Sequence, residues 1–121
     1  MREKVRDKGR LEHILEQLQN VESFLSGKTL ADLQADKILQ YAVIKSIEII
    51  GEAAYMLSNE FRTQHSEVEW DGIIRMRHVL VHGYYQISVP LVWSIIEEDL
   101  PSFKEQIVKL LEITNTSRQT F

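Results

Sequence analysis

The chain has 121 residues, a formal net charge of −4 and no cysteine. Hydrophobic residues make up 44% and charged residues 26%, which is typical of a globular protein in water, and the length suits one domain over residues 1–121. The lack of cysteine excludes disulfides, thiol catalysis and thiolate-bound zinc. The negative charge argues against non-specific coating of nucleic acid. No apolar run could span a bilayer and the N-terminus has no signal-peptide core, so we expect no membrane contact and a cytoplasmic location.

The first half of the chain carries two helical patterns. Apolar residues recur with a period of about 3.6 from about Val5 to Leu25. Gly9 weakens the first part, so we expect a firm helix from about Arg10 and a weaker helical tendency before it. Gly27 ends this helix, and a threonine two residues later caps the next one. The second pattern runs over residues 30–61, with a candidate break near residue 36.

The second pattern is apolar on several sides over residues 38–57, which predicts a central helix that the rest of the bundle surrounds. Small residues around Gly51 permit the close approach of another helix, from this chain or from a second subunit. One polar stripe remains and has two readings. It is a narrow solvent face with a Lys45–Glu48 pair, which is the simpler reading, or Lys45 and Glu52 line a functional cleft.

A polar connection over residues 62–68 leads to the stretch from Trp70 to Tyr85, which holds the densest cluster of groups able to bind a phosphate. It is predicted to begin as a helix and to end at Gly83. Arg77 lies in the middle of the apolar face of this helix, and His82 lies in or just after its last turn. The apolar face carries Trp70, Ile73, Ile74 and Val81.

The last helical pattern starts after Ser88, the predicted N-cap, with Pro90 in the first turn. Pro101 is expected to kink this helix or to split it in two, because proline lacks the backbone N–H. Residues from about 114 to 121 are expected to form a flexible tail. The patterns together predict an all-α protein, a bundle of four or five helices with short connections.

Arg77 and His82 are the strongest candidates for chemistry. An arginine cannot lose its proton, so its partial burial requires an anionic partner from the protein or from a ligand. Five positions on a helix separate the two residues by about 140°, so they converge only if the helix unwinds near Gly83 or if two subunits share the site. Arg75 lies almost two turns before His82 on one stripe and is a candidate second phosphate contact.

Each of these residues also has a plainer reading. His82 would serve as a cap for its own helix end, and Tyr84 would be a packing aromatic. His78 and His82 are one turn apart, a spacing that can hold a metal, but no carboxylate or further histidine joins them at a ligand spacing. We therefore expect neither a metal nor a cofactor.

A resemblance adds to this reading. Residues 77–84 (RHVLVHGY) fit the Arg-x4-His-x-Tyr pattern of the HEPN-superfamily ribonucleases, specifically the HepT-like toxins. Residues 47–54 resemble the central helix of that family, residues 70–77 its lead-in, and residues 92–104 its last helix. His78 is a departure, since many members carry asparagine there, and it leaves the local hydrogen bonding open.

The resemblance implies a HEPN-like, all-helical homodimer whose two motifs face a shared cleft, and a metal-independent endoribonuclease. His82 would act as general base or acid on the ribose 2′-hydroxyl of RNA, and Arg77 would neutralise the charge of the phosphorane. The product would be a 2′,3′-cyclic phosphate. Supporting contacts would come from Arg75, His78, Glu52 and Lys45.

The resemblance also implies a partner, a nucleotidyltransferase antitoxin of the MNT type, which transfers AMP to the motif tyrosine, here Tyr84, and so inhibits the toxin. Two other functions remain open from the residues. One is a non-catalytic helical dimer that binds nucleotide or RNA or docks a nucleotidyltransferase, and it predicts binding without product. The other is a hydrolase with a metal on His78 and His82, which predicts loss of activity in a chelator.

Overall fold

The computed structural model of the chain describes the backbone of residues 2–82 and 88–119, and the side chains of residues 5–81 and 88–114. All regular elements in this part are helical, which confirms the all-α class. In chain order they are α1 (Arg2–Leu25), α2 (Leu30–Ala35), α3 (Lys37–Tyr55), α4 (Asn59–Gln64), α5 (Trp70–His82), α6 (Val89–Ser94), the π-helical turn η2 (Ile95–Asp99) and α7 (Leu100–Gln119). None of the helices searched in this part is long and apolar enough to cross a membrane.

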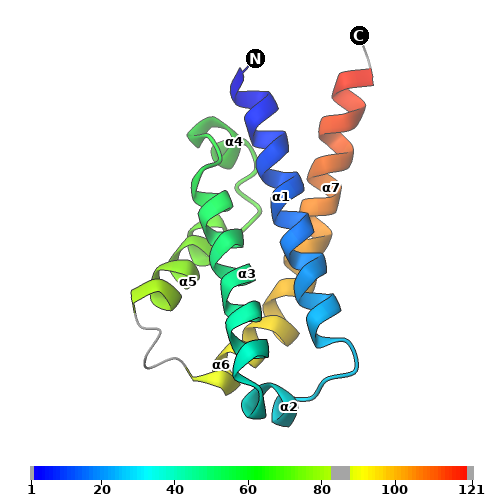
Figure 1. Cartoon of the computed structure of the whole chain (residues 1–121). Helices are drawn as coiled ribbons and strands as arrows, with labels where there is room; N and C mark the ends of the chain where they lie inside the picture. The colour runs from blue at the N-terminus through cyan, green and yellow to red at the C-terminus, as the bar shows by residue number, and fades with distance from the viewer. Residues whose placement is uncertain (1, 83–87, 120–121) are drawn as a thin grey trace.

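The longer helices pack as neighbours along the bundle, α7 against α1, α1 against α3, and α3 against α5 (Figure 1). The short helices α2 and α6 lie at one end of the bundle, and both chain termini lie at the other end (Figure 1). Aliphatic side chains from these helices fill the core between them. The largest fully buried ones are Leu11, Ile14, Val21, Leu33, Val43, Ile47, Ile50 and Ile107.

Local capping explains the breaks on either side of α2. Gly27 has a φ of +72°, a left-handed conformation that suits glycine after a helix end. Thr29 and Asp32 then form a capping box at the start of α2. The predicted break at Asp36 is confirmed, since this residue ends α2 and its carboxylate accepts a hydrogen bond of 3.1 Å from the Leu39 N–H at the start of α3.

Two predicted boundaries in the first half were wrong. Helix α1 begins at Arg2 rather than near Arg10, because Gly9 lies on an exposed side with nothing within 4 Å and costs the helix only about 1 kcal/mol. The second pattern also breaks a second time, after α3. Ser58 caps α4 there by accepting a hydrogen bond from the Phe61 N–H.

Helix α3 is the central helix in that it contacts both α1 and α5, but it is not surrounded as predicted. Ile38 is 81% exposed and Met56 51% exposed, so one long side of α3 has no covering element in the described structure. The apolar residues at these two positions therefore face solvent rather than the core.

The last helical segment agrees with the predicted start. Ser88 caps α6 by accepting a hydrogen bond from the Leu91 N–H, and Pro90 lies in the first turn. Pro101 does not split the helix, because the turn η2 precedes it and the Leu100 N–H bonds to the Ile95 carbonyl, five residues back. A wider turn is one way for a helix to accommodate a residue without an N–H. Helix α7 then continues to Gln119, beyond the tail boundary expected near residue 114.

Candidate active site on helix α5

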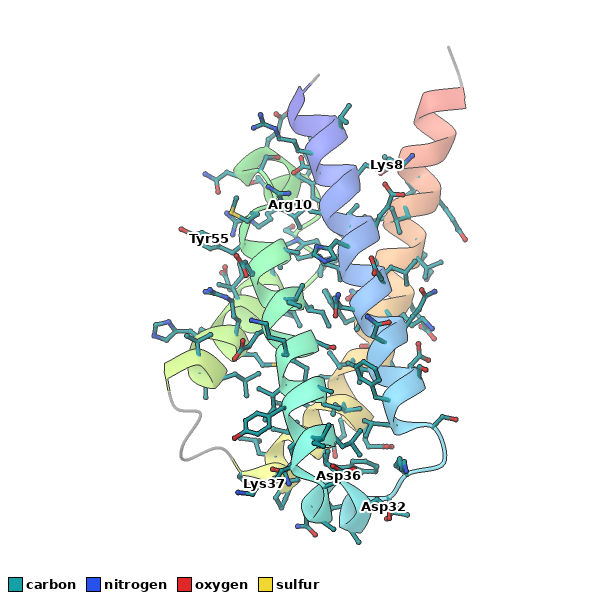
Figure 2. All side chains as sticks on the ribbon, viewed as in Figure 1. Lys8, Arg10, Asp32, Asp36, Lys37 and Tyr55 are labelled. Atoms are coloured by element: carbon teal, nitrogen blue, oxygen red, sulfur yellow. The ribbon has the colours of Figure 1, made fainter. Side chains whose placement is uncertain are left out.

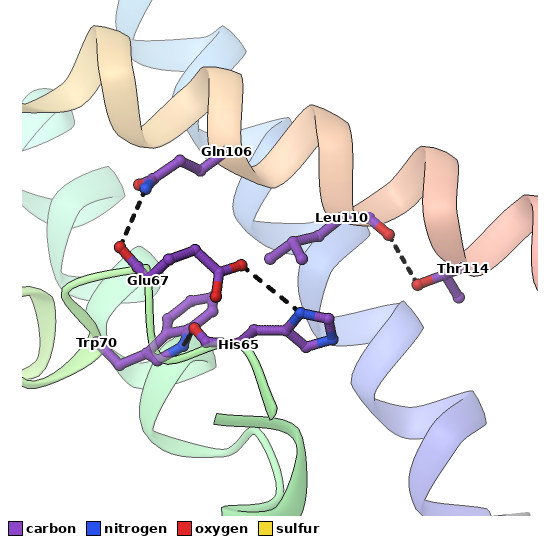
Figure 3. Close-up of polar contacts among 6 residues, drawn as sticks. All are labelled: His65, Glu67, Trp70, Gln106, Leu110 and Thr114. Atoms are coloured by element: carbon purple, nitrogen blue, oxygen red, sulfur yellow. Dashed lines mark hydrogen bonds and ion pairs between the residues drawn. The ribbon is translucent and has the colours of Figure 1, made fainter. Parts of the chain in front are cut away.

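The start of α5 is fixed by contacts to the preceding loop and to α7 (Figure 3). The Trp70 indole is buried, and its Nε1–H donates a hydrogen bond of 3.0 Å to the His65 carbonyl. The edge of this ring packs on Phe103 of α7 at a centroid distance of 6.1 Å. Gln106 of α7 also donates to the Glu67 carbonyl, so the loop and α7 hold the N-terminal end of the helix in place.

The side of α5 that meets α3 carries Ile73, Arg77 and Leu80, at helical steps of four and three. Ile73 is 8% exposed and Leu80 3% exposed. Val81 was predicted on this face, but it is 37% exposed. The prediction placed Val81 on the buried face and left out Leu80. Because Leu80 is buried, the face of α5 that packs in the core includes Leu80 rather than Val81.

Arg77 is half-buried between α5 and α3, with its aliphatic stem against the backbone of Gly51. Within the described part of the chain its guanidinium has no hydrogen-bond or ion-pair partner. A half-buried permanent cation without a protein carboxylate is suited to an anion from outside, such as a phosphate. The predicted role of Arg77 as an anion contact stays a prediction.

The other two motif residues lie at the edge of the described structure. The backbone of His82 is the last residue of α5, but its side chain lies outside the described residues. Tyr84 and Tyr85 also lie outside them, within residues 83–87. The roles of His82 and Tyr84 therefore stay predictions. The helix is continuous from Arg77 to His82, and five positions along an ideal helix correspond to a rotation of about 140°.

The supporting candidates lie on exposed surface near Arg77. Arg75 and His78 are exposed on α5, and Glu52 is exposed on α3, next to Gly51. Lys45 pairs with Glu48 at 3.6 Å and its side chain is 71% exposed, which fits the solvent-face reading. No ion pair joins Lys45 or Glu52 to Arg77 among the described side chains, so their place in a cleft stays a prediction.

The structure adds a feature that periodicity alone did not reveal. Large apolar and aromatic side chains are exposed on α3, on α5 and at the C-terminal end of α3. Tyr55, for example, points outward from α3 and is 59% exposed (Figure 2). The exposed set on these two helices is Ile38, Tyr41, Tyr55, Met56, Val79 and Val81.

The other cavities that the described structure forms do not include Arg77, although one of about 440 Å³ borders α5 at Ile73 and Met76. A groove of about 730 Å³ between α1 and α7 has Trp93, Leu100 and Val108 in its lining and does not include Arg77. Among the described side chains, no three of the types His, Asp and Glu gather in a way that could hold a metal ion.

Comparison with known proteins decides the family. The family model described as "Ribonuclease HepT-like" matches residues 14–110, which include α5 and the whole of the Arg-x4-His-x-Tyr motif. The chain belongs to the HepT-like ribonuclease family. No solved structure gave a significant match.

Curated relatives of this HepT-like chain are archaeal and bacterial. A Thermococcus cleftensis protein named "Probable ribonuclease HepT" is 39% identical over 100 residues, which are 83% of this chain and 91% of that protein. A Caldanaerobacter subterraneus protein, named as an inferred RNase, is 35% identical over 84% of this chain and 91% of its own length. A Methanocaldococcus jannaschii protein, whose name joins a gamma-glutamylcyclotransferase to an inferred RNase, is 39% identical, but the chain spans only 46% of its length.

Proposed function

We propose that this HepT-like chain is a metal-independent endoribonuclease and the toxin of a toxin–antitoxin pair. One observation carries the proposal. Arg77 is half-buried, has no partner among the described side chains, and stands five positions before His82 on one helix, in a chain of a ribonuclease family. The buried part of this residue is its aliphatic stem, and none of its guanidinium nitrogens is among the buried polar atoms without a partner in the described structure, so the charged group is open to an anion from outside.

The proposed chemistry needs two groups at one phosphodiester. His82 accepts the proton of the ribose 2′-hydroxyl or donates one to the leaving 5′-oxygen, a role that gives about 10²–10⁴-fold in rate. Arg77 stabilises the charge that develops on the phosphorane oxygens, a contribution of about 3 kcal/mol or more. The 2′-oxygen attacks phosphorus, the bond to the 5′-oxygen breaks, and the product carries a 2′,3′-cyclic phosphate.

The two groups diverge on one chain, so we propose that a second copy completes the site. The polar stripe of α3 provides a suitable contact. Its members Tyr41, Lys45, Glu48, Glu52 and Tyr55 follow one another at alternating steps of three and four, and the apolar Ile38 precedes them by one further step of three. Such steps place side chains in one row along a helix, as in a coiled coil.

An antiparallel second copy of α3 would pair this row with itself in complementary fashion. Ile38 would meet the partner subunit's Tyr55, and Lys45 would meet the partner subunit's Glu48. Tyr41 would meet the partner subunit's Glu52, whose carboxylate can accept the phenol hydrogen bond. A shift by one heptad in one direction would place Glu48 against the partner subunit's Glu52, and the opposite shift would place Glu48 against the partner subunit's Ile38, so neither shift keeps the Lys45–Glu48 pair across the interface. The exposed apolar residues at both ends would be covered.

We further propose an MNT-type nucleotidyltransferase as antitoxin and Tyr84 as the residue that it modifies with AMP. The phosphate of an O-AMP-tyrosine two positions after His82 would bring an anion to Arg77 and block the substrate. The measurement is the intact mass after co-expression with the antitoxin. One or more AMP units that map to Tyr84 support the proposal, and an unmodified Tyr84 removes this regulation while leaving the ribonuclease untouched.

The test of the ribonuclease is RNA cleavage by the purified chain, free of its partner, against Arg77→Ala and His82→Ala, with and without chelator. We expect kcat to fall by on the order of 10²-fold or more in each variant, and chelator to have no effect. Equal cleavage by all three would assign the activity to a contaminant. Retained RNA binding with no cyclic-phosphate product would leave a helical binding module.

A further inference from the structure

Helices α3 and α5 approach each other closely at Gly51, a buried glycine about one turn before the C-terminal end of α3. A Cβ atom at this position would lie 2.2 Å from the Cβ of Arg77, 3.1 Å from its Cγ and 3.2 Å from the Ile73 carbonyl oxygen. These atoms belong to the backbone of α5 or to the first part of the arginine side chain. They cannot rotate away as the tip of a side chain can, so any side chain at position 51 would push the two helices apart.

This closeness is specific to Gly51 among the glycines that the structure describes. A Cβ at Gly9 or Gly27 would meet nothing within 4 Å, and one at Gly72, on α5 itself, would meet only the Glu69 Cβ at 3.9 Å. Glycine in a helix interior costs about 0.5–1 kcal/mol relative to alanine. The α3 helix therefore gives up stability at the position that lies directly under Arg77.

The contact between the Arg77 stem and the α3 backbone at Gly51 (the arginine seat) determines where the guanidinium can reach. The stem of Arg77 lies on the α3 backbone, and no described side chain holds the guanidinium by a hydrogen bond or an ion pair. The depth of the stem contact is therefore the main constraint that the described structure places on the charged group. A displacement of about 1 Å in a group that acts on the reacting atoms can cost on the order of 10²-fold in rate.

We infer that Gly51 is a positioning residue for Arg77: its lack of a side chain sets the depth at which the guanidinium meets the scissile phosphate. The inference rests on the proposed role of Arg77 in RNA cleavage. Because that role concerns charge that develops in the transition state, a wrongly seated arginine lowers kcat and leaves KM nearly unchanged. If Gly51 had only a structural role, its replacement would lower the melting temperature, but kcat measured at a temperature where the protein remains folded would not change.

The test is the kinetics of Gly51→Ala, with Gly72→Ala as the matched control on the open side of α5. We expect Gly51→Ala to lower kcat by about 10-fold or more with KM within about 3-fold, and Gly72→Ala to leave both unchanged. In the Arg77→Gly background, where the clashing Cβ is gone, Gly51→Ala should cause no further loss of kcat. Wild-type kcat in Gly51→Ala, or an equal loss in both backgrounds, would overturn the inference.

A stability cycle keeps the test independent of activity and of poor folding. Gly51→Ala should lower the melting temperature by about 5–10 °C with Arg77 present, and by less than about 3 °C in the Arg77→Gly background, where the clashing Cβ is gone. Equal shifts in the two backgrounds would contradict the seat itself. A different outcome separates this inference from the proposed function. If the melting temperatures behave as expected but Arg77→Ala cleaves RNA like wild type, the proposed function fails, and the contact between Gly51 and Arg77 is only a packing contact.

Discussion

Asp7 is a buried carboxylate on α1 whose partner, Ser58, lies 51 positions further along the chain. The carboxylate accepts hydrogen bonds from the Ser58 N–H at 2.8 Å and from its hydroxyl at 2.7 Å. Ser58 in turn caps α4, so one acidic side chain connects α1 to the turn that follows α3. Hydrogen bonds to a charged group contribute more than neutral ones, about 1.5–3 kcal/mol.

Asp7→Ala is therefore expected to lower the free energy of unfolding by about 2 kcal/mol or more, because it removes both bonds and leaves the Ser58 N–H without its acceptor. The control is Asp36→Ala, which removes an exposed cap with one bond and should cost only about 1 kcal/mol. Urea unfolding measures both. If Asp7→Ala lowers the free energy of unfolding no more than Asp36→Ala does, the bonds between Asp7 and Ser58 stabilise the fold no more than an ordinary exposed helix cap.

Asp32 provides a pH-dependent contribution at the start of α2. Hydrogen bonds from the Thr29 backbone and hydroxyl hold the pKa of this carboxyl below its usual value of 3.8. A depressed pKa in the folded state stabilises the fold above the unfolded pKa, and this contribution is lost as the pH falls through the folded pKa.

Asp32→Asn should therefore lower the melting temperature near pH 7, where the contribution is present, and the difference from wild type should shrink below about pH 4 as the wild-type carboxyl gains its proton. The melting temperature as a function of pH measures this. Glu16→Gln, at an exposed position of α1, is the control for the loss of one negative charge. The same pH-dependent difference in the control would assign the effect to net charge rather than to the capping box.

At the scale of elements, the sequence was most informative where the cause is local. The cap at Ser88, the break at Asp36 and the turn at Gly27 all depend on residues within a few positions of each other, and each was predicted. The break before Ser58 was missed because the helical period continues through it and Asp7, the partner of this serine, lies on another helix. The motif identified Arg77. Its contact with Gly51 joins two helices that are distant in the sequence, so the sequence predicted only that some helix packs closely against the small residues around Gly51.

Exposure was the harder quantity to predict, because it depends on what lies opposite each face. Ile38, Met56 and Val81 have the period of buried residues, yet they are exposed in the described structure. A second copy of the chain would supply the missing neighbour. Apolar residues at the period of a core but on an open face are what the proposed interface would leave in the sequence, and one chain alone cannot distinguish them from a core.

The N-terminal anchor of α5 gives an element-scale prediction. Trp70→Phe keeps an aromatic ring but removes the N–H that bonds to the His65 carbonyl, and should lower the free energy of unfolding by about 1–2 kcal/mol. Trp93→Phe is the control, since the half-buried Trp93 makes no hydrogen bond among the described residues. Thermal unfolding that affects both variants equally would show that ring size, rather than the anchor, determines the loss.

At the scale of the whole molecule, the proposed register of two α3 helices makes a charge-swap prediction. Lys45→Glu alone and Glu48→Lys alone should each be monomeric, because like charges would then meet across the interface. A mixture of the two variants should form a heterodimer, with both pairs attractive again. Sedimentation of each variant and of the mixture measures this, and variants that dimerise as well as wild type would rule out this face.

Complementation between two inactive chains tests the central claim most directly. Arg77→Ala and His82→Ala are refolded separately and together, and the rate at which each sample forms the 2′,3′-cyclic phosphate product is measured. A shared site predicts that each variant alone is inactive and that the mixture regains cleavage, because a mixed dimer unites one intact arginine with one intact histidine. A mixture as inactive as its components, shown by mass to contain mixed dimers, would contradict a site that two copies of the chain build together.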